Sequence, residues 1–349
     1  MTFLKAAVFY GPGKLILEER SIPQPSLGEI VVKVDTSGLC PTDVKIYKFG
    51  SQNVKIPIVL GHEFSGKIYS LPSDIISFKE GERVVIPADA YCGKCLMCIS
   101  SKENLCFDTI SFGYQIDGAH AEYVLIPKRF LDRGGVFKVP ENISLEIMSM
   151  TEPLACAVHD IKLMKIDPSK RLLVVGDGPM GLLHVLVAKN FGCSEIVVVG
   201  LFDWKLKLAS ELGATHTINS QEIKDVKKEI KSLYQEGVDA CALTVVTKDT
   251  IVQSLGSTIK GGYVSIFAGV PKDSVYTTLD PNIIHYNEIS LIGSSGYTYE
   301  DFRIAFKIAI NNESKLSRLV SHRFRLDDIH DAITAWEDKE RSLKILLKR

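Results

Sequence analysis

The sequence lacks the features that mark membrane proteins and nucleic-acid-binding proteins. No apolar run reaches the roughly 18 residues that a membrane-spanning helix requires. Lys and Arg number 41 against 42 Asp and Glu, so no basic excess indicates a nucleic acid or an anionic membrane as partner. The first residues, Met1–Ala6, lack the basic and then apolar order of a signal peptide, and we expect none. These absences favour a globular protein whose partner is a small molecule.

The chain is too long for a single core, and its pattern changes near residue 152. At 349 residues, two domains are expected. The first part alternates short apolar runs with Gly and Pro turns, which predicts a β-rich domain. The clearest predicted strands are Lys5–Phe9, Glu29–Val34, Arg83–Ile86 and Ala121–Ile126.

After Glu152 short apolar strands alternate with helical segments, which is typical of βαβ units around a parallel sheet. The predicted elements are strands Leu172–Val175, Glu195–Val199, Ala240–Val246 and Tyr263–Ala268, with helices Gly181–Phe191 and Lys205–Leu212. Two amphipathic helices follow near the end, and we interpret their apolar faces as core packing. These faces are Phe302, Ala305, Phe306 and Ala309, and Ile329, Ala332, Ile333 and Trp336. The predicted fold class is α/β.

Four of the eight cysteines lie close together, at Cys92, Cys95, Cys98 and Cys106. Clustered cysteines indicate metal ligands before disulfides in a reducing compartment, and we therefore expect a cytoplasmic protein. Short Cys-x2-Cys steps let one loop supply a tetrahedron of thiolates to a structural zinc. A chance cluster of free thiols and an iron–sulfur cluster are the alternatives.

A second set of ligand-type residues is scattered at Cys40, His62, Glu63 and Glu152. Each alone is weak evidence, because a single Cys or His is commonly a buried core residue. Their neighbourhoods strengthen the hypothesis, since Thr42 places a hydroxyl two residues from Cys40. Three protein ligands and a water are typical of catalytic zinc, which polarises a bound oxygen. We predict a catalytic zinc here, with Thr42 passing on the proton of an alcohol.

The segment after the strand Leu172–Val175 is a glycine loop of residues 176–181, with the sequence Gly176-Asp177-Gly178-Pro179-Met180-Gly181. A G-x-G-x-x-G loop between a strand and a helix is a strong indicator of dinucleotide binding. Its glycines allow a pyrophosphate to approach the helix N-terminus. The alternative is a tight turn that binds no ligand.

The following strand ends at Gly200, where NAD-binding proteins commonly have a carboxylate. Nothing at Gly200 would repel a 2′-phosphate, and Lys205 and Lys207 are near in sequence. No arginine follows, Asp203 is an alternative partner for the ribose, and the two lysines are also explained by a solvated helix face. The pattern gives a slight preference for NADP over NAD.

Together these motifs resemble the medium-chain zinc-dependent alcohol dehydrogenases, especially the sorbitol, galactitol-phosphate and threonine dehydrogenase branch. The resemblance covers the whole chain. It rests on Cys40–Asp43, Gly61–Glu63, the four cysteines, Glu152–Leu154 and the glycine loop. It implies a GroES-like catalytic domain of residues 1–152 and 288–349, a Rossmann domain of residues 153–287, and a homotetramer or, less often, a homodimer.

The resemblance also implies roles for single residues. Cys40 and His62 match zinc ligands, Glu63 matches the ligand of the polyol branch, and Glu152 matches the acid that binds the zinc or its water. Thr42 matches the proton-relay hydroxyl. The residues that would line the substrate pocket are Tyr47, Phe112 and Tyr297.

Two departures from the family pattern affect the expected chemistry. Lys45 stands where many relatives have a relay histidine, so the proton leaves through Lys45, through water or from Glu152. The segment Gly293–Tyr297 lacks the arginine that threonine and sorbitol dehydrogenases place there. Because an amino-acid substrate needs a partner for its carboxylate, threonine becomes less favoured.

The expected function is NAD(P)-dependent oxidation of a polyol or sugar-alcohol hydroxyl to a ketone, or the reverse, with two zinc ions per chain. The alternatives within enzymes are an L-threonine dehydrogenase and a simple secondary-alcohol dehydrogenase. The alternative from another class is a non-catalytic dinucleotide-binding protein, which predicts one zinc per chain or none.

Overall fold

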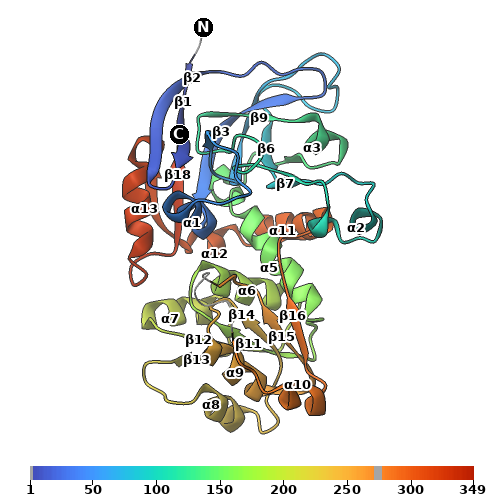
Figure 1. Ribbon diagram of the computed structural model, residues 1–349, viewed down its shortest axis with the longest axis vertical. Helices are drawn as coiled ribbons and strands as arrows, with labels where there is room; N and C mark the ends of the chain where they lie inside the picture. Colours follow the sequence, from blue (N-terminus) through green and yellow to red (C-terminus); the bar gives the residue numbers. More distant parts are fainter. Residues whose placement is uncertain (1–2, 271–276) are drawn as a thin grey trace. The chain divides into compact units, whose positions relative to one another are not determined.

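The computed structural model describes residues 3–270 and 277–349 (Figure 1). The chain divides into two compact units, the first of residues 1–152 and 298–349 and the second of residues 153–297. Within the described ranges, no helix combines the length and apolar character needed to cross a membrane.

The first unit is β-rich, as predicted. Its N-terminal elements are β1 (Phe3–Gly11), β2 (Lys14–Ser21), β3 (Ile30–Leu39), α1 (Pro41–Phe49), β4 (Ile58–Val59), β5 (Glu63–Ser70), β6 (Arg83–Ile86), β7 (Asp89–Ala90), α2 (Leu96–Ile99), the 3-10 helix η1 (Glu103–Leu105), β8 (Ile110–Ser111), β9 (Tyr123–Ile126), α3 (Lys128–Asp132), β10 (Phe137–Lys138) and α4 (Leu145–Met148). Its C-terminal elements are α11 (Tyr299–Asn311), α12 (Glu313–Ser317), β17 (Val320–Arg325), the 3-10 helix η3 (Leu326–Asp328), α13 (Ile329–Glu337) and β18 (Lys344–Lys348).

Strand β3 organises the main sheet of this unit, whose order is β10-β6-β5-β3-β18-β17 with β9 also on β3. The C-terminal strand β18 runs antiparallel to β3, so residues 345–348 lie beside residues 36–39 (Figure 1). In this register Gly38 lies opposite Glu63 of β5 and Leu39 lies opposite Ile345 of β18. The end of β3 therefore brings together three segments that are far apart in sequence.

The second unit is a doubly wound parallel sheet. Its elements are β11 (Arg171–Val175), α6 (Pro179–Asn190), β12 (Glu195–Gly200), α7 (Asp203–Leu212), β13 (His216–Asn219), α8 (Val226–Leu233), β14 (Val238–Leu243), α9 (Lys248–Ser257), β15 (Thr258–Ile266), α10 (Pro281–Asn287) and β16 (Ser290–Gly293), after the boundary helix α5 (Thr151–Leu163). The strand order β13-β12-β11-β14-β15-β16 is that of a dinucleotide-binding fold, with its switch point beside β11.

The predicted elements are present, with ends that differ by a few residues. The two amphipathic helices are α11 and α13; six of the eight predicted face residues are buried, whereas Phe306 and Trp336 are partly buried. The return to the first unit comes at Thr298 and not at the predicted residue 288. The reason is that β16 pairs with β15 and so extends the parallel sheet.

Candidate metal and dinucleotide sites

The thiol of Cys40 is held at the N-terminus of α1. Cys40 is the N-cap residue of this helix, and its sulfur accepts the N–H of Thr42 at 3.5 Å. The N–H of Cys40 donates to the Asp43 carboxylate at 3.1 Å, which completes a capping box. The Cys-Pro-Thr-Asp sequence therefore fixes the start of the helix and the direction of the sulfur together.

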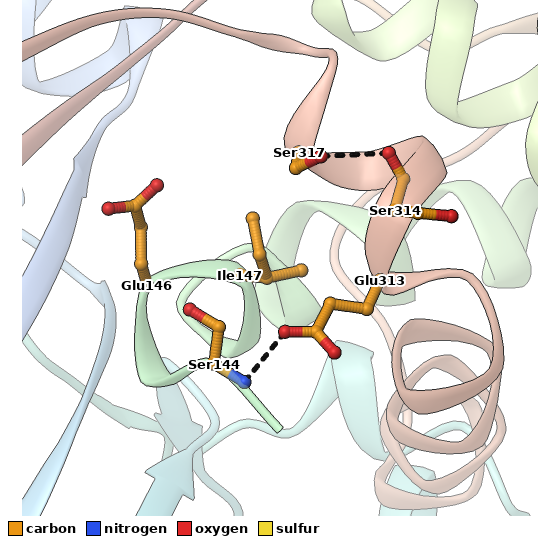
Figure 2. A pocket seen from close by; sticks show the side chains of 6 residues that line it. All are labelled: Ser144, Glu146, Ile147, Glu313, Ser314 and Ser317. Carbon is orange, nitrogen blue, oxygen red and sulfur yellow. Dashed lines mark hydrogen bonds between the residues drawn. The ribbon is translucent and has the colours of Figure 1, made fainter. Parts of the chain in front are cut away.

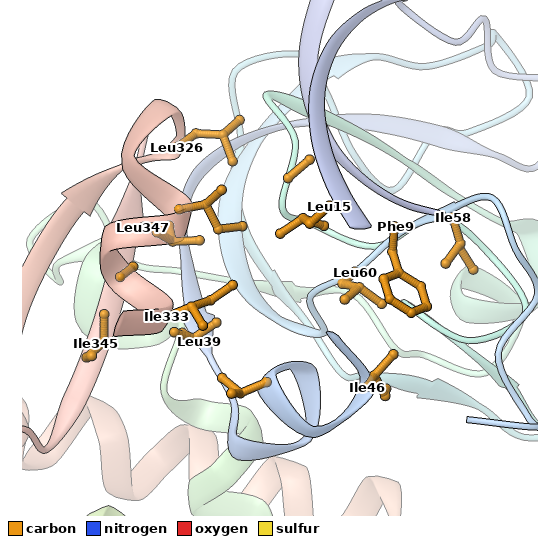
Figure 3. Packing of buried hydrophobic residues seen from close by; sticks show 14 of the residues in the cluster. Phe9, Leu15, Leu39, Ile46, Ile58, Leu60, Leu326, Ile333, Ile345 and Leu347 are labelled. Carbon is orange, nitrogen blue, oxygen red and sulfur yellow. The ribbon is translucent and has the colours of Figure 1, made fainter. Parts of the chain in front are cut away.

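Helix α1 packs against the first unit through a continuous apolar cluster (Figure 3). Leu39, next to Cys40, and Ile46 of α1 belong to this cluster, together with Ile333 of α13 and Ile345 of β18. All four side chains are at most 6% exposed. Burial of this kind contributes roughly 1.5–3 kcal/mol per large side chain, so Cys40 sits on a rigid support.

Three predicted ligands converge at the end of β3. The ligand atoms of Cys40, His62 and Glu63 all lie within 4.8 Å of one another. This set of one sulfur, one imidazole nitrogen and one carboxylate oxygen suits an open zinc site. The residues present therefore fit the catalytic zinc that the motifs predict.

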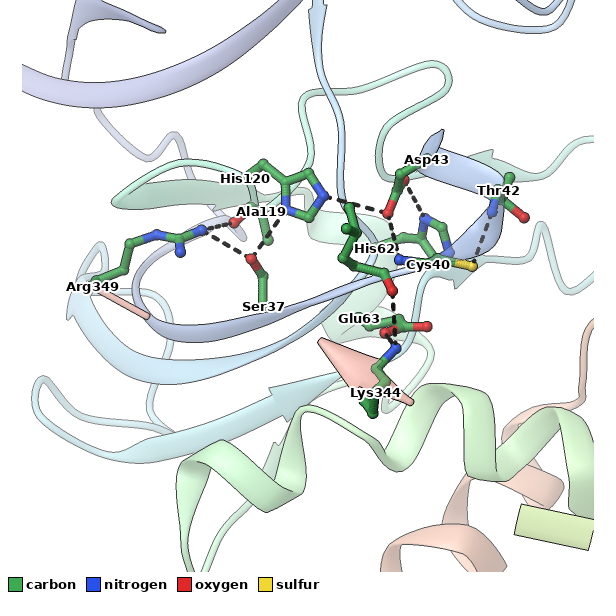
Figure 4. Close-up of polar contacts among 11 residues, drawn as sticks. Ser37, Cys40, Thr42, Asp43, His62, Glu63, Ala119, His120, Lys344 and Arg349 are labelled. Atoms are coloured by element: carbon green, nitrogen blue, oxygen red, sulfur yellow. Dashed lines mark hydrogen bonds and ion pairs between the residues drawn. The ribbon is translucent and has the colours of Figure 1, made fainter. Parts of the chain in front are cut away.

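The His62 ring is oriented by a buried carboxylate (Figure 4). Asp43 Oδ1 lies 3.4 Å from His62 Nδ1, which leaves Nε2 as the ring nitrogen available to a metal. The same carboxylate lies 3.4 Å from His120 Nε2. Burial by itself would raise the pKa of Asp43, but the two imidazoles hold it below its usual range. Asp43 therefore remains an anion that fixes the His62 ring.

This polar chain continues to the C-terminal residue. His120 Nδ1 lies 3.1 Å from the hydroxyl of Ser37, which accepts an N–H of Arg349 at 3.0 Å. Arg349 also donates to the carbonyl of Ala119 (Figure 4). The last residue of the chain thus supports the orientation of His120, which contacts Asp43.

Glu63 has a buried cationic partner, the ammonium of Lys344 (Figure 4). The two side chains are 2% and 6% exposed. A Cβ at Gly38 would lie 2.0 Å from the Glu63 carboxylate and 2.9 Å from Lys344 Nζ, so only glycine leaves room for this pair. Burial opposes the charge of Lys344, but the neighbouring Glu63 raises the pKa of Lys344, so this lysine keeps its charge.

We expect Lys344→Met to lower the free energy of unfolding by about 3–5 kcal/mol, because it leaves the Glu63 carboxylate buried without a cation. The matched control is Lys348→Met on the same strand. Lys348 pairs with Glu146 at 3.0 Å but is 42% exposed, so a loss within about 1 kcal/mol is expected. Urea unfolding of the metal-free proteins measures both. Equal losses in the two variants would contradict a special role for the buried pair.

Glu152 lies in the first turn of α5 and is not one of the three converging ligands. Its carboxyl is buried, at 8% exposure. Burial raises the pKa of Glu152 to about 8. The nearby His62 lowers this pKa, whereas the negative charge of Glu63 raises it further. Without a metal, Glu152 is therefore a protonated acid near neutral pH beside the ligand set.

This raised pKa predicts a pH dependence of stability for the metal-free protein. The folded state keeps the Glu152 proton up to about pH 8, whereas the unfolded chain loses it near the ordinary glutamate pKa of 4.5. The folded state binds the extra proton between these values, so stability falls as pH rises through this window. Glu152→Gln should flatten this fall in urea unfolding at pH 5, 6, 7 and 8. An unchanged slope would contradict the raised pKa.

The four clustered cysteines have the geometry of a zinc tetrahedron. Cys95 Sγ lies 3.6 Å from Cys98 Sγ and 3.8 Å from Cys106 Sγ, and Cys92 Sγ lies 3.9 Å from Cys98 Sγ. A tetrahedron with Zn–S bonds of about 2.3 Å has edges of about 3.8 Å. Backbone N–H groups of Cys98 and Phe107 lower the pKa of Cys95 to about 6, which favours the thiolate. The cluster therefore fits a closed structural zinc site.

The glycine loop has the shape that a pyrophosphate requires. A Cβ at Gly181 would lie 1.9 Å from the carbonyl oxygen of Gly176, so helix α6 packs directly on the loop. A Cβ at Gly178 would meet nothing within 4 Å, which leaves open space at the helix start. No side chain caps this N-terminus among the described residues, so its N–H groups suit a phosphate.

The remaining predicted residues differ in their surroundings. Thr42 is half-buried, Lys45 is exposed, and Tyr47 packs its partly buried ring against the apolar cluster around α1. Phe112 is wrong as a pocket residue, because it is fully buried between Phe64 and Phe130. Tyr297 is likewise fully buried, so its ring is closed to a substrate.

The interpretation of Lys205 as part of a solvated helix face was wrong. Its side chain is buried at 3% exposure, with Nζ 4.8 Å from the Phe202 ring centre and 5.4 Å from that of Trp204. Lys207 is exposed, as expected of a solvated face. The two lysines therefore do not act as a pair.

One hollow of the first unit contains none of the predicted site residues (Figure 2). Glu313 accepts the N–H of Ser144 there at 2.8 Å, so this carboxylate caps the start of α4. The lining residues are Ser144, Glu146, Ile147, Glu313, Ser314 and Ser317. None of the residues that line the hollow is one of the candidate metal ligands.

Sequence reasoning missed Asp43, His120, Lys344 and Arg349 as supports of the metal site. Two of them carried a signal. Asp43 stands three residues after Cys40, which is the capping-box position. Lys344 is a single charge beside the apolar run Ile345–Leu347, where a lysine needs a buried partner. His120 and Arg349 carried no local signal.

Comparison with known proteins agrees with this geometry. Residues 26–141 match the alcohol dehydrogenase GroES-like domain, and residues 179–311 match the zinc-binding dehydrogenase family. The chain is therefore an oxidoreductase that acts on CH–OH groups with NAD(P). It belongs to the medium-chain zinc-dependent alcohol dehydrogenases.

Individual relatives cover nearly the whole chain. Sorbitol dehydrogenase of Bacillus subtilis is 30% identical over 350 residues, covering 99% of this chain and 97% of that protein. L-threonine 3-dehydrogenase of Bacillus licheniformis is 31% identical over 312 residues, covering 88% of each. The structure of a protein described as a zinc-binding dehydrogenase from Sinorhizobium meliloti, bound to NADP, matches with a TM-score of 0.91. It has 28% identity and covers 100% of both chains.

Proposed function

We propose that the chain oxidises a secondary hydroxyl of a polyol or sugar alcohol to a ketone, or reduces the ketone, with NAD(P). The convergence of Cys40, His62 and Glu63 within 4.8 Å is the observation that carries this proposal. This ligand set resembles that of the polyol branch, in which the residue matched by Glu63 serves as a ligand. The similarity to a sorbitol dehydrogenase over 99% of the chain supports the same substrate class.

In this proposal two zinc ions bind each chain, one at Cys40, His62 and Glu63 with Glu152 nearby, and one at the four cysteines. When bound, the first zinc supplies Lewis-acid polarisation of the substrate oxygen, and the nicotinamide supplies the hydride acceptor. Asp43 holds the His62 ring in its ligand orientation at 3.4 Å. Lys344 balances the charge of Glu63 inside the buried site.

Thr42 and Lys45 supply a path for the alcohol proton. Thr42 is held by the start of α1, two residues from the Cys40 sulfur. Lys45 follows three residues later, so both side chains project from the same face of the helix. Lys45 is exposed to solvent and Thr42 is half-buried. We propose that the Thr42 hydroxyl accepts the alcohol proton while it donates its own proton to Lys45 or to water, which releases it to the solvent.

L-threonine and simple secondary alcohols are the alternative substrates. The similarity to L-threonine 3-dehydrogenase supports the first. However, residues Gly293–Tyr297 contain no arginine for a substrate carboxylate, and Tyr297 is buried. We therefore favour a neutral polyol. We also propose a cytoplasmic homotetramer, with a homodimer as the alternative assembly.

The test follows nicotinamide reduction by the purified protein with polyols, sugars, L-threonine and simple alcohols, using NAD and NADP in parallel. Turnover with a polyol or sugar, lost after treatment with a strong chelator, is the expected result. Turnover with L-threonine alone would replace the polyol proposal. Silence across the panel in a protein holding fewer than two zinc ions per chain would favour the non-catalytic alternative.

A further inference from the structure

The end of β12 is shaped around a carboxylate that comes from another segment. Gly200 ends this strand, and a Cβ there would lie 2.5 Å from Asp177 Cβ and 2.7 Å from its Oδ2. Asp177 is the second residue of the glycine loop after β11. The Asp177 side chain thus fills the space that an acidic side chain at position 200 would occupy. Glycine at position 200 leaves room for it.

The Asp177 carboxylate accepts the two backbone N–H groups that follow β12. Its Oδ2 receives the N–H of Leu201 and the N–H of Phe202, each at 2.8 Å. The residue is 7% exposed, so this arrangement is built into the fold and is not a surface contact. Two charge-assisted bonds to rigid backbone hold the carboxylate in a single position.

These two N–H groups stand where a 2′-phosphate would need donors. In this fold the end of the second strand faces the adenosine ribose, and an acid there hydrogen-bonds the 2′-hydroxyl of NAD. A 2′-phosphate is bound by cations and by backbone N–H groups at a helix start. Here Asp177 already occupies the N–H groups before α7, and its negative charge repels a phosphate.

The other charged residues nearby do not reverse this effect. Lys205 is buried against the rings of Phe202 and Trp204, so its ammonium is held against the aromatic rings. Asp203 is engaged elsewhere, because its Oδ1 accepts the side-chain amide of Asn219 at 2.6 Å. Of the two carboxylates Asp177 and Asp203, it is thus Asp177 that is directed at the end of β12.

We propose that Asp177 selects NAD over NADP, acting from the glycine loop in place of the acid that similar folds carry at the end of the second strand. This reverses the slight preference for NADP that was drawn from Gly200 and the nearby Lys205 and Lys207. The proposal rests on the dinucleotide part of the proposed function. It does not depend on the substrate, on the zinc ions or on the proton path.

Binding measurements test the proposal without any substrate. NADH and NADPH are titrated into the zinc-containing protein, and nicotinamide fluorescence reports each Kd. The wild type should bind NADH at least about tenfold more tightly than NADPH, the range expected from a bond to a charged group. Asp177→Ser frees two N–H groups and removes the charge, so NADPH should tighten by about tenfold or more while NADH weakens.

Two further variants keep the test decisive. Asp177→Asn retains an oxygen acceptor for the N–H groups and removes only the charge, so it should narrow the NADH preference even if the serine variant folds poorly. Asp203→Asn removes an equal charge nearby and tests the alternative ribose partner, and the ratio of the two Kd values should stay as in the wild type.

The outcomes separate this proposal from the proposed function. A wild type that prefers NADPH, a wild type that binds neither nucleotide, or a ratio unaffected in both Asp177 variants would overturn the selection by Asp177. A shift in Asp203→Asn as large as in the Asp177 variants would also overturn it. A silent substrate panel together with a clear NADH preference that Asp177→Asn narrows would support Asp177 and contradict only the polyol activity.

Discussion

Replacing Cys40 with serine should remove one of two zinc ions per chain and lower kcat/KM by about 10³-fold or more. Serine is a poorer ligand for zinc than a thiolate, and three converging ligands become two. Zinc contributes several kcal/mol of charge stabilisation in reactions of this kind, and each 1.4 kcal/mol is about a factor of ten. Metal analysis and steady-state kinetics on the best substrate of the panel measure the two effects.

The fold should survive this substitution, because α1 is held by its apolar cluster and not by the metal. The matched control is Cys193→Ser. Cys193 is a buried thiol of the second unit that lies 3.1 Å from the carbonyl of Lys170, and a hydroxyl can keep this bond. This control should retain two zinc ions and full turnover. Full activity in Cys40→Ser would refute the zinc role of Cys40.

Replacing Cys95 with serine should instead act on stability. The variant should lose the structural zinc, keep the catalytic one, and lose at least about 5 kcal/mol of unfolding free energy, because zinc binding in such loops is folding free energy. The three sulfur distances of 3.6–3.9 Å in the cluster place the cysteines where one zinc ion would join both ends of this loop. Thermal unfolding should move down by roughly 10 °C or more.

A neighbouring exposed residue gives the control for this measurement. Lys102→Ala changes a side chain of the same loop that is not a ligand, so its melting temperature and zinc content should match the wild type. If Cys95→Ser kept two zinc ions and an unchanged melting temperature, the four cysteines would be a chance cluster of thiols. A change in the oligomeric state of Cys95→Ser would also agree with a structural role of this loop.

The two cysteine variants together distinguish the enzyme from a non-catalytic nucleotide-binding protein. If the protein is an enzyme, the wild type should bind two zinc ions and each variant one, and turnover should be lost only in Cys40→Ser. The non-catalytic alternative predicts one zinc or none in the wild type and no effect of Cys40→Ser on metal content. The zinc count therefore answers the question before any substrate is known.

The prediction of the fold succeeded where local patterns repeat. Period-two and short apolar runs marked β3, β6 and β11, and the glycine loop marked the junction of β11 with α6. These signals arise because each strand buries one or both faces and each helix buries one stripe. The strand β16 escaped this reasoning, since four residues give too short a pattern to show which sheet they join.

The errors at single residues have a common cause. Phe112 and Tyr297 were placed in a pocket by analogy of position, and both are enclosed by packing that no local pattern reveals. A solvated face was one explanation of Lys205, because lysine on a helix is usually exposed, but the rings of Phe202 and Trp204 cover this side chain. Burial of one side chain depends on distant neighbours, which a single sequence does not identify.

The sequence alone indicated the four clustered cysteines, the candidate ligands Cys40, His62 and Glu63, and the nucleotide loop, because each belongs to a short motif that reflects local geometry. Only the tertiary structure decided which partners complete them. Lys344 reaches Glu63 through the register of β18 on β3. Asp177 reaches the end of β12 across neighbouring strands. Such pairs join residues that are distant in sequence, and strand pairing, which the spacing of residues does not encode, brings them together.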